Sequence, residues 1–271
     1  MTITDPTGPT TDLSVKQYSP PASNSSAGAV LLASSNSDLN TVSVIATATN
    51  AVVATITVDE YPVGVAVTPN GAFAYVANSG SNTVSVIATA TNAVVATITV
   101  GAGPETLAVT PNGDYVYVAN FASTVSVIAT ATNAVVATIT VTGFTPQYIA
   151  ITPNGAFAYL GTSSSVVLRI NTATRSWSQI AISAPPNQLV VSPNGDYIYV
   201  AEGSQFEVIA TATNAVVASV AVSGGTVYGL AFPPVANGGV GSQISLAGPQ
   251  LSGGTLSGVI AGLVALGLFS S

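Results

Sequence analysis

The chain has 271 residues, of which only 5% are charged, and its net charge is −7. Its cations, Lys16, Arg169 and Arg175, are too few to release the counterions of a nucleic acid backbone, so nucleic acid is excluded as a partner. The sequence contains no histidine and no cysteine, which excludes disulfides, thiolate chemistry and the Ser–His or Cys–His pairs of nucleophilic enzymes. We therefore expect no bound cofactor.

Residues 1–28 form a segment rich in Thr, Ser and Pro, with the pair Pro20-Pro21 near its end. Low hydrophobicity and adjacent prolines favour an extended arm over a packed element. Two roles stay open for this arm: a flexible tail, or a strand that adds to the sheet edge of another subunit. Its first residues are neither basic nor apolar, so no secretory signal is visible.

Residues 29–234 are built from repeats. The stretch TVSVIATATNAVVATITV occurs almost unchanged at Thr41–Val58, Thr83–Val100 and Thr124–Val141, and two degenerate copies begin at Val166 and Phe206. Self-similarity at a period of about 40 residues is typical of architectures in which each unit buries its apolar face against its neighbours. We therefore interpret this region as a single repeat domain.

Each repeat divides into four short strands. In the first complete copy these are Thr41–Ala48, Ala51–Val58, Pro62–Thr68 and Ala72–Asn78, and the last is entered through Pro69-Asn70-Gly71. Asn-Gly between apolar strands is a strong hairpin signal, because both residues accept a positive φ at small cost. Four antiparallel strands in each repeat predict an all-β fold, a β-propeller of four-stranded blades.

The segments after these turns, Tyr75-Val76-Ala77-Asn78 and Tyr117-Val118-Ala119-Asn120, complete a pattern that resembles the YVTN-type β-propeller repeat. The resemblance implies a ring of antiparallel blades, and similar propellers occur in surface-layer proteins, adhesins and some enzymes. The family commonly has Asp after Val-Ile and Lys after Thr-Ala-Thr-Asn, whereas this chain has alanine at both positions, as at Ala46 and Ala51. Because charges on exposed strands block edge-to-edge pairing, their loss predicts apolar blade rims.

A count of the strands predicts five blades. The segment Ala29–Ala33 reads as a YVAN-type strand of a first blade that lacks its innermost strand, and Val227–Phe232 reads as an innermost strand without a blade. Pairing the two would complete a mixed N- and C-terminal blade and remove both open edges. A sixth blade would need further strands from Gln243 onward.

Residues 235–271 match no blade, and consist of a Gly-rich linker followed by the apolar run Leu256–Phe269. A membrane-spanning helix needs about 20 apolar residues, more than this run supplies. A full membrane span is therefore not expected, whereas contact with a membrane stays open. The run either folds back on its own propeller, inserts into a neighbouring subunit or contacts lipid, and we favour insertion. The candidate assembly residues are Leu256, Val259, Ile260, Leu263, Val264, Leu266, Leu268 and Phe269.

Carboxylates are the remaining candidates for chemistry. Asp59, Glu60 and Glu105 precede predicted innermost strands, and Glu202 lies just after a YVAN-type strand. These connections gather around the central channel of a propeller, where they could bind Ca²⁺ or act as an acid and a base. Because the repeats do not supply an acid at equivalent positions, we interpret them as solvated loop carboxylates. Asp59, Glu60 and Glu105 stay weak metal candidates, and we assign no catalytic residue.

These observations predict a non-catalytic structural protein, extracellular or on the cell surface, that self-assembles into a filament or layer through its terminal segments. Its expected partners are copies of itself, with surface glycans or other cell-surface proteins as further candidates. An adhesin or lectin-like module that uses one propeller face is the alternative. A propeller enzyme is the least favoured interpretation.

Overall fold

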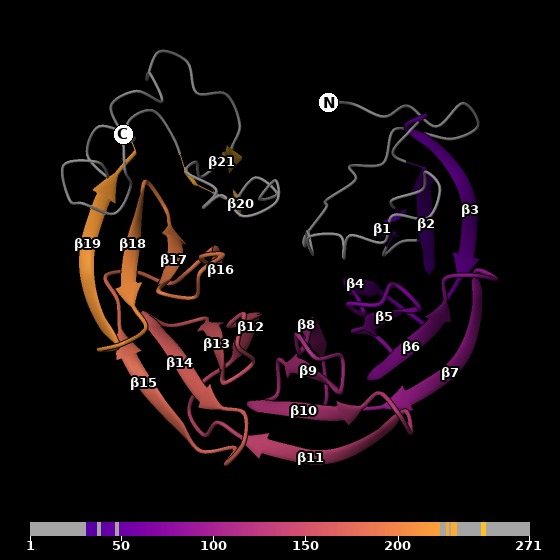
Figure 1. The fold of residues 1–271 in the computed structure, drawn as a ribbon, viewed down its shortest axis with the longest axis horizontal. Helices are drawn as coiled ribbons and strands as arrows, with labels where there is room; N and C mark the ends of the chain where they lie inside the picture. Colours follow the sequence, from indigo (N-terminus) through magenta and orange to yellow (C-terminus); the bar gives the residue numbers. More distant parts are fainter. Residues whose placement is uncertain are drawn as a thin grey trace.

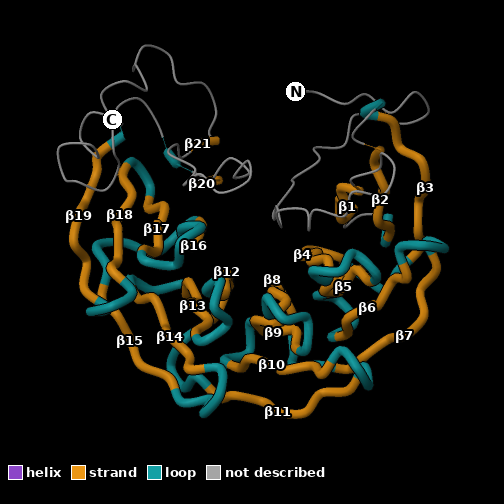
Figure 2. Tube along the Cα trace, in the orientation of Figure 1, coloured by secondary structure: helices purple, strands orange, loops and turns teal. Residues whose placement is uncertain are grey.

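The computed structural model describes residues 31–36, 39–46, 49–222, 226–227, 229–231 and 245–247. In this part of the chain there are 21 β-strands joined by turns and loops, and no helix (Figure 2). The strands form antiparallel sheets that follow one another along an arc, and in the sheets of three or four strands the first strand lies near the centre and the last at the rim (Figure 1). The prediction of an all-β fold with four-stranded antiparallel blades is confirmed.

Four sheets contain four strands each, and we call them blades 2 to 5. Blade 2 contains β4 (Pro62–Val67), β5 (Phe73–Asn78), β6 (Thr83–Ala88) and β7 (Ala93–Thr99). Blade 3 contains β8 (Pro104–Val109), β9 (Tyr115–Asn120), β10 (Thr124–Ala129) and β11 (Ala134–Thr140). Blade 4 contains β12 (Pro146–Ile151), β13 (Phe157–Thr162), β14 (Val166–Asn171) and β15 (Trp177–Ala181). Blade 5 contains β16 (Gln188–Val191), β17 (Tyr197–Glu202), β18 (Gln205–Ala210) and β19 (Ala215–Ala221).

Two smaller sheets stand at the ends of the arc. Blade 1 contains β1 (Leu31–Asn36), β2 (Thr41–Ala46) and β3 (Ala51–Thr57), and the last sheet contains β20 (Gly229–Ala231) and β21 (Ser245–Ala247). The predicted mixed blade is wrong, because β20 pairs with β21 while β1 pairs with β2. Strands from Gln243 onward were considered in the sequence only as part of a sixth blade, and β21 begins two residues after that point. The sheets in the described part do not close into a ring, and the predicted count of five blades is not confirmed.

The terminal segments carry several predictions that the structure does not reach. The N-terminal arm of residues 1–28 and the candidate assembly residues between Leu256 and Phe269 all lie outside the described residues. Within the described residues, no helix has the length and apolar character that crossing a membrane requires.

The core lies between neighbouring blades. The two middle strands of a blade, such as β5 and β6, are buried on both faces because each face packs against an adjacent blade. Rim strands such as β7 are exposed over most of their length, with Ile98 as the buried residue of β7, since only one face of the strand meets the core. Their outer face exposes valines, including Val53 and Val95, at more than half of their surface, as the loss of charged residues predicts.

A buried tyrosine in the second strand of a blade joins it to the next blade. The Tyr75 hydroxyl donates to Asn133 Oδ1 at 2.8 Å, the Tyr117 hydroxyl to the Thr172 carbonyl at 3.1 Å, and the Tyr159 hydroxyl to Asn214 Oδ1 at 3.1 Å. Each acceptor lies in the rim turn of the following blade. Burial raises the pKa of all three tyrosines, so they remain neutral donors at physiological pH.

We expect Tyr117→Phe to lower the free energy of unfolding by about 1 kcal/mol, because it leaves the Thr172 carbonyl without its donor while keeping the packed ring. Tyr115→Phe is the matched control, since Tyr115 is two residues away on the same strand but 38% exposed. Urea unfolding of both variants checks the prediction. Equal stability of the two variants would show that the hydroxyl does not hold the blades together.

Candidate active site

A cluster of polar side chains lies where blade 4 meets blade 5. Glu202 is the last residue of β17 and pairs across the hairpin with Gln205, the first residue of β18. Glu207 follows two residues later on β18, so it shares a face of the sheet with Gln205. Ser183 comes from the connection between β15 and β16, and thus reaches the cluster from the preceding blade.

Hydrogen bonds hold the two carboxyl groups in place. Glu202 Oε2 accepts from the Ala184 amide at 3.2 Å and from Gln205 Nε2 at 3.3 Å. Glu207 Oε1 accepts from the hydroxyls of Ser183 and, at 3.2 Å, of Ser219. Glu202 and Glu207 are only 1% and 2% exposed, and Glu202 Oε1 has no hydrogen-bond partner. The structure therefore buries two acids side by side and leaves one oxygen free to take a proton.

The same position in blades 2 and 3 contains a neutral cluster. Asn78 Nδ2 donates to Thr83 and Ser85 at 3.1 and 2.9 Å, and Asn120 Nδ2 donates to Thr124 and Ser126 at 3.1 and 3.0 Å. In the strand register, Glu202, Gln205 and Glu207 replace the Asn, Thr and Ser of these clusters. Each asparagine also has an unpaired buried oxygen, as Glu202 does. Blade 5 thus keeps the geometry of blades 2 and 3 but carries two acids in it.

The electrostatics of the pair favour one shared proton. Burial is the largest cause that raises the pKa of Glu202, from 4.5 to about 7, and Glu207 raises it further through its charge and a side-chain hydrogen bond. The Gln205 and Ala184 bonds act in the opposite direction, and no cationic side chain is among the causes. Because burial and the adjacent Glu207 both disfavour the ionised form of Glu202, its pKa of about 7 lets this side chain exchange a proton near neutral pH. Such a pair can donate and accept protons in catalysis.

Three of the four carboxylates singled out in the sequence lie outside this cluster. Asp59 Oδ2 accepts a hydrogen bond from Thr83 Oγ1 at 2.7 Å, Glu60 is exposed, and Glu105 is half-buried on β8. Among the described residues, no three His, Cys, Asp or Glu side chains lie close enough together to hold a metal ion. The structure therefore does not bring Asp59, Glu60 and Glu105 together.

Sequence reasoning noticed Glu202 but missed Glu207 and Ser183. The signal was available, because the degenerate copy reads Gln-Phe-Glu at 205–207 where the regular copies read Thr-Val-Ser. Aligning the copies would have placed an acid at the position of Ser85, on the face that the strand pairing brings beside Glu202. Ser183 had no such signal, because its place in the cluster depends on how one blade meets the next.

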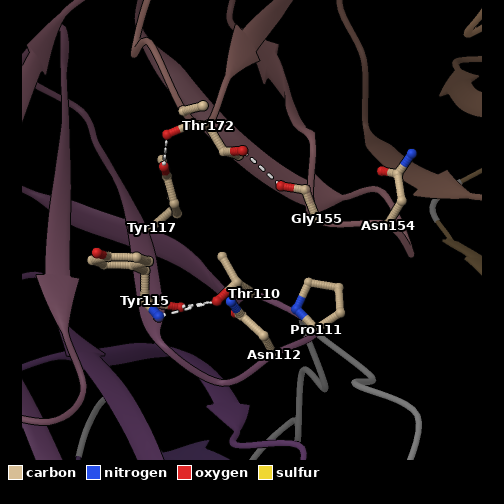
Figure 3. A pocket seen from close by; sticks show the side chains of 9 residues that line it. Thr110, Pro111, Asn112, Tyr115, Tyr117, Asn154, Gly155 and Thr172 are labelled. Carbon is tan, nitrogen blue, oxygen red and sulfur yellow. Dashed lines mark hydrogen bonds between the residues drawn. The ribbon is translucent and has the colours of Figure 1, made fainter.

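A pocket of about 240 Å³ lies at the opposite end of the blades, between blades 3 and 4 (Figure 3). The Tyr117–Thr172 bond and a bond from Thr172 Oγ1 to the Gly155 carbonyl, at 2.6 Å, use polar groups of its wall. Its lining contains no acidic or basic side chain, and it is smaller than most ligand sites, which occupy about 300–1,000 Å³. It is lined by Thr110, Pro111, Asn112, Tyr115, Tyr117, Asn154, Gly155, Thr172 and Ala173. The carboxyl cluster is the better candidate for chemistry.

Similarity to known proteins agrees with the fold. Residues 25–134, less than half of the chain, match the family model described as "Lactonase, 7-bladed beta-propeller". Among solved structures, Kuenenia stuttgartiensis hydrazine synthase is similar with a TM-score of 0.71 and 25% sequence identity, over 80% of this chain and 70% of that one. No curated protein sequence matches the chain. These matches place the chain among the β-propeller proteins, without singling out the YVTN-type proteins of surface layers.

The prediction of a non-catalytic structural protein that self-assembles is overturned by these matches, because the family and the solved structure both bear the names of enzymes. A filament or surface layer has no support from either. The error came from weighing the missing histidines and cysteines as evidence against catalysis. A buried carboxyl group with a raised pKa is chemically able to exchange a proton near neutral pH, as those residue types do.

We expect Glu202 to make the wild-type protein less stable as pH rises from about 4.5 through about 7. The folded state binds the Glu202 proton more tightly than the unfolded state, so its contribution to stability is present at low pH and is lost as the proton leaves. Glu202→Gln removes this loss and gains on the order of 2 kcal/mol over wild type across that interval. Urea unfolding of the wild type and of Glu202→Gln at several pH values measures this difference in stability, with the exposed Glu60→Gln as control. A stability difference between Glu202→Gln and the wild type that does not change with pH would contradict the raised pKa of Glu202.

Proposed function

We propose that the protein is an enzyme-like propeller that hydrolyses a small cyclic ester, with Glu202 and Glu207 as its acid and base. The observation that carries this proposal is the buried pair of carboxyl groups, which occupies a position where two other blades have neutral side chains. Buried acids without a cation destabilise a fold, and such arrangements are concentrated at catalytic sites. The name of the matching family supports a lactone as the substrate class.

Ester hydrolysis needs the two functions that the pair supplies. A base must take the proton of the attacking oxygen, and an acid must protonate the alkoxide that leaves the carbonyl carbon. Glu207, held by the Ser183 and Ser219 hydroxyls, fits the base. Glu202, which has a pKa of about 7 and an unpaired Oε1, fits the acid. A ring ester keeps both products on one molecule, so a shallow surface site suffices for binding.

Ser183 provides the route from solvent to the buried pair. It is exposed and bonds to Glu207, whereas both Glu207 and Glu202 are buried. A substrate carbonyl therefore meets the cluster at Ser183 and needs no deep pocket.

Within the propeller proteins, we assign the repeats to the YVTN type on the Tyr-Val-Ala-Asn segments at residues 75–78 and 117–120.

We expect the purified protein to open small lactones, and Glu202→Gln or Glu207→Gln to lower kcat/KM by about 10² to 10⁴, the usual contribution of a general acid or base. The rate should fall as pH rises through about 7, because Glu202 then loses the proton that it donates. A pH-stat assay over a panel of four- to seven-membered lactones measures both effects.

The chain offers two controls for this assay. Glu60→Gln changes an exposed acid outside the cluster and should keep full activity. The triple variant Glu202→Asn, Gln205→Thr and Glu207→Ser rebuilds in blade 5 the neutral cluster that blades 2 and 3 already contain. It should fold and be inactive. Activity in the triple variant, or no lactone opening by the wild type, would overturn the proposal.

A further inference from the structure

Ser183 differs from the residues at the same place in other blade junctions. It is the second residue after a rim strand, a position that Asp59, Gly101 and Thr142 occupy after β3, β7 and β11. Asp59 accepts from the Thr83 hydroxyl at 2.7 Å, and the Gly101 amide donates to Ser126 Oγ at 3.1 Å. Only at Ser183, among these positions, does a hydroxyl donate to a carboxyl group of the following blade.

The geometry at Ser183 combines access with activation. The residue is exposed, yet its Oγ donates directly to Glu207 Oε1, and its amide lies 3.4 Å from Glu207 Oε2. The carboxyl group is thus oriented by two contacts with the same residue. A serine becomes nucleophilic when an adjacent base accepts its proton and a third group orients or assists that base. Glu207 supplies the base, and Glu202 lies beside it with an unpaired buried oxygen.

We propose that Ser183 is a nucleophile that forms an ester with the substrate's acyl group, with Glu207 as its base and Glu202 as the proton donor. This inference rests on the proposed function, because it names the attacking oxygen of that same reaction. It adds a covalent intermediate and a specific reactive residue to it.

The proposed reaction balances in two steps. Ser183 Oγ bonds to the carbonyl carbon of the lactone as its proton passes to Glu207, and the ring C–O bond breaks as the alkoxide takes the proton of Glu202. The product of this step is a hydroxyacyl ester of Ser183. Water then attacks the ester and gives one proton back to the pair, and Ser183 Oγ leaves with the proton held by Glu207. The pair ends with the one proton with which it began.

The test treats the full-length protein with a β-lactone probe that carries an alkyne reporter, and locates the adduct by intact mass and peptide mapping. We expect one adduct per chain, on Ser183, which is lost in Ser183→Ala and reduced at least tenfold in Glu207→Gln. Ser204→Ala is the matched control, because Ser204 is an exposed serine in the adjacent β17–β18 turn and lies outside the cluster. Circular dichroism and the melting temperature confirm that each variant is folded.

The outcomes separate this inference from the proposed function. If the wild type opens lactones and folded Ser183→Ala opens them equally fast, water is the nucleophile, so the inference fails and the proposed function stands. If Ser183 is acylated by the probe but no lactone is turned over, the nucleophile is supported and the substrate class is wrong. An adduct spread over several serines, unchanged in Glu207→Gln, would overturn the assignment of Ser183.

Discussion

Polar side chains that a blade buries depend on hydrogen-bond partners in their own blade or across the junction with the next blade, and this constraint governs the structure. The middle strands are covered on both faces, so their side chains cannot reach water. At one end of the junction, the buried tyrosine hydroxyls donate to the rim turn of the following blade. At the other end, Asn, Thr and Ser satisfy one another. An unpaired donor there would cost about 1–3 kcal/mol, which is why these residues recur within an otherwise apolar repeat.

The fifth blade obeys the same constraint with charged residues. Burial, together with the neighbouring Glu207, raises the pKa of Glu202 to about 7, so a buried acid that exchanges a proton stands where blades 2 and 3 have Asn78 and Asn120. A sequence under pressure for stability alone would keep the neutral set, because blades 2 and 3 show that it fits the same backbone positions. Local features that violate such a rule are concentrated at functional sites. The difference between equivalent blades is therefore more informative than any blade alone.

The repeat copies were sufficient to predict the strands, the hairpin turns and the apolar rims, because strand periodicity and the Pro-Asn-Gly turn are local properties. Gly71, for example, has the φ of 71° that its turn requires. The pairing of β20 with β21 was missed because a strand as short as Ser245–Ala247 carries little signal in its own sequence. Of the cluster, only Glu202 was named from the sequence, and its interpretation as a solvated loop carboxylate is wrong because Glu202 is buried at the end of β17. The other members of the cluster depend on the strand register and on the blade junction, and the latter brings Ser183 to Glu207 across 24 residues of sequence.

A chain without histidine must obtain proton transfer near neutral pH from another residue type. An exposed carboxyl group titrates too low for this task, and lysine and tyrosine titrate too high. Burial beside a second acid moves Glu202 into the range that an unperturbed histidine occupies. The scarcity of cations makes this shift possible, because an arginine beside the pair would stabilise both carboxylates and lower the pKa again. The low charge of the chain is thus the condition under which the pKa of Glu202 rises to about 7.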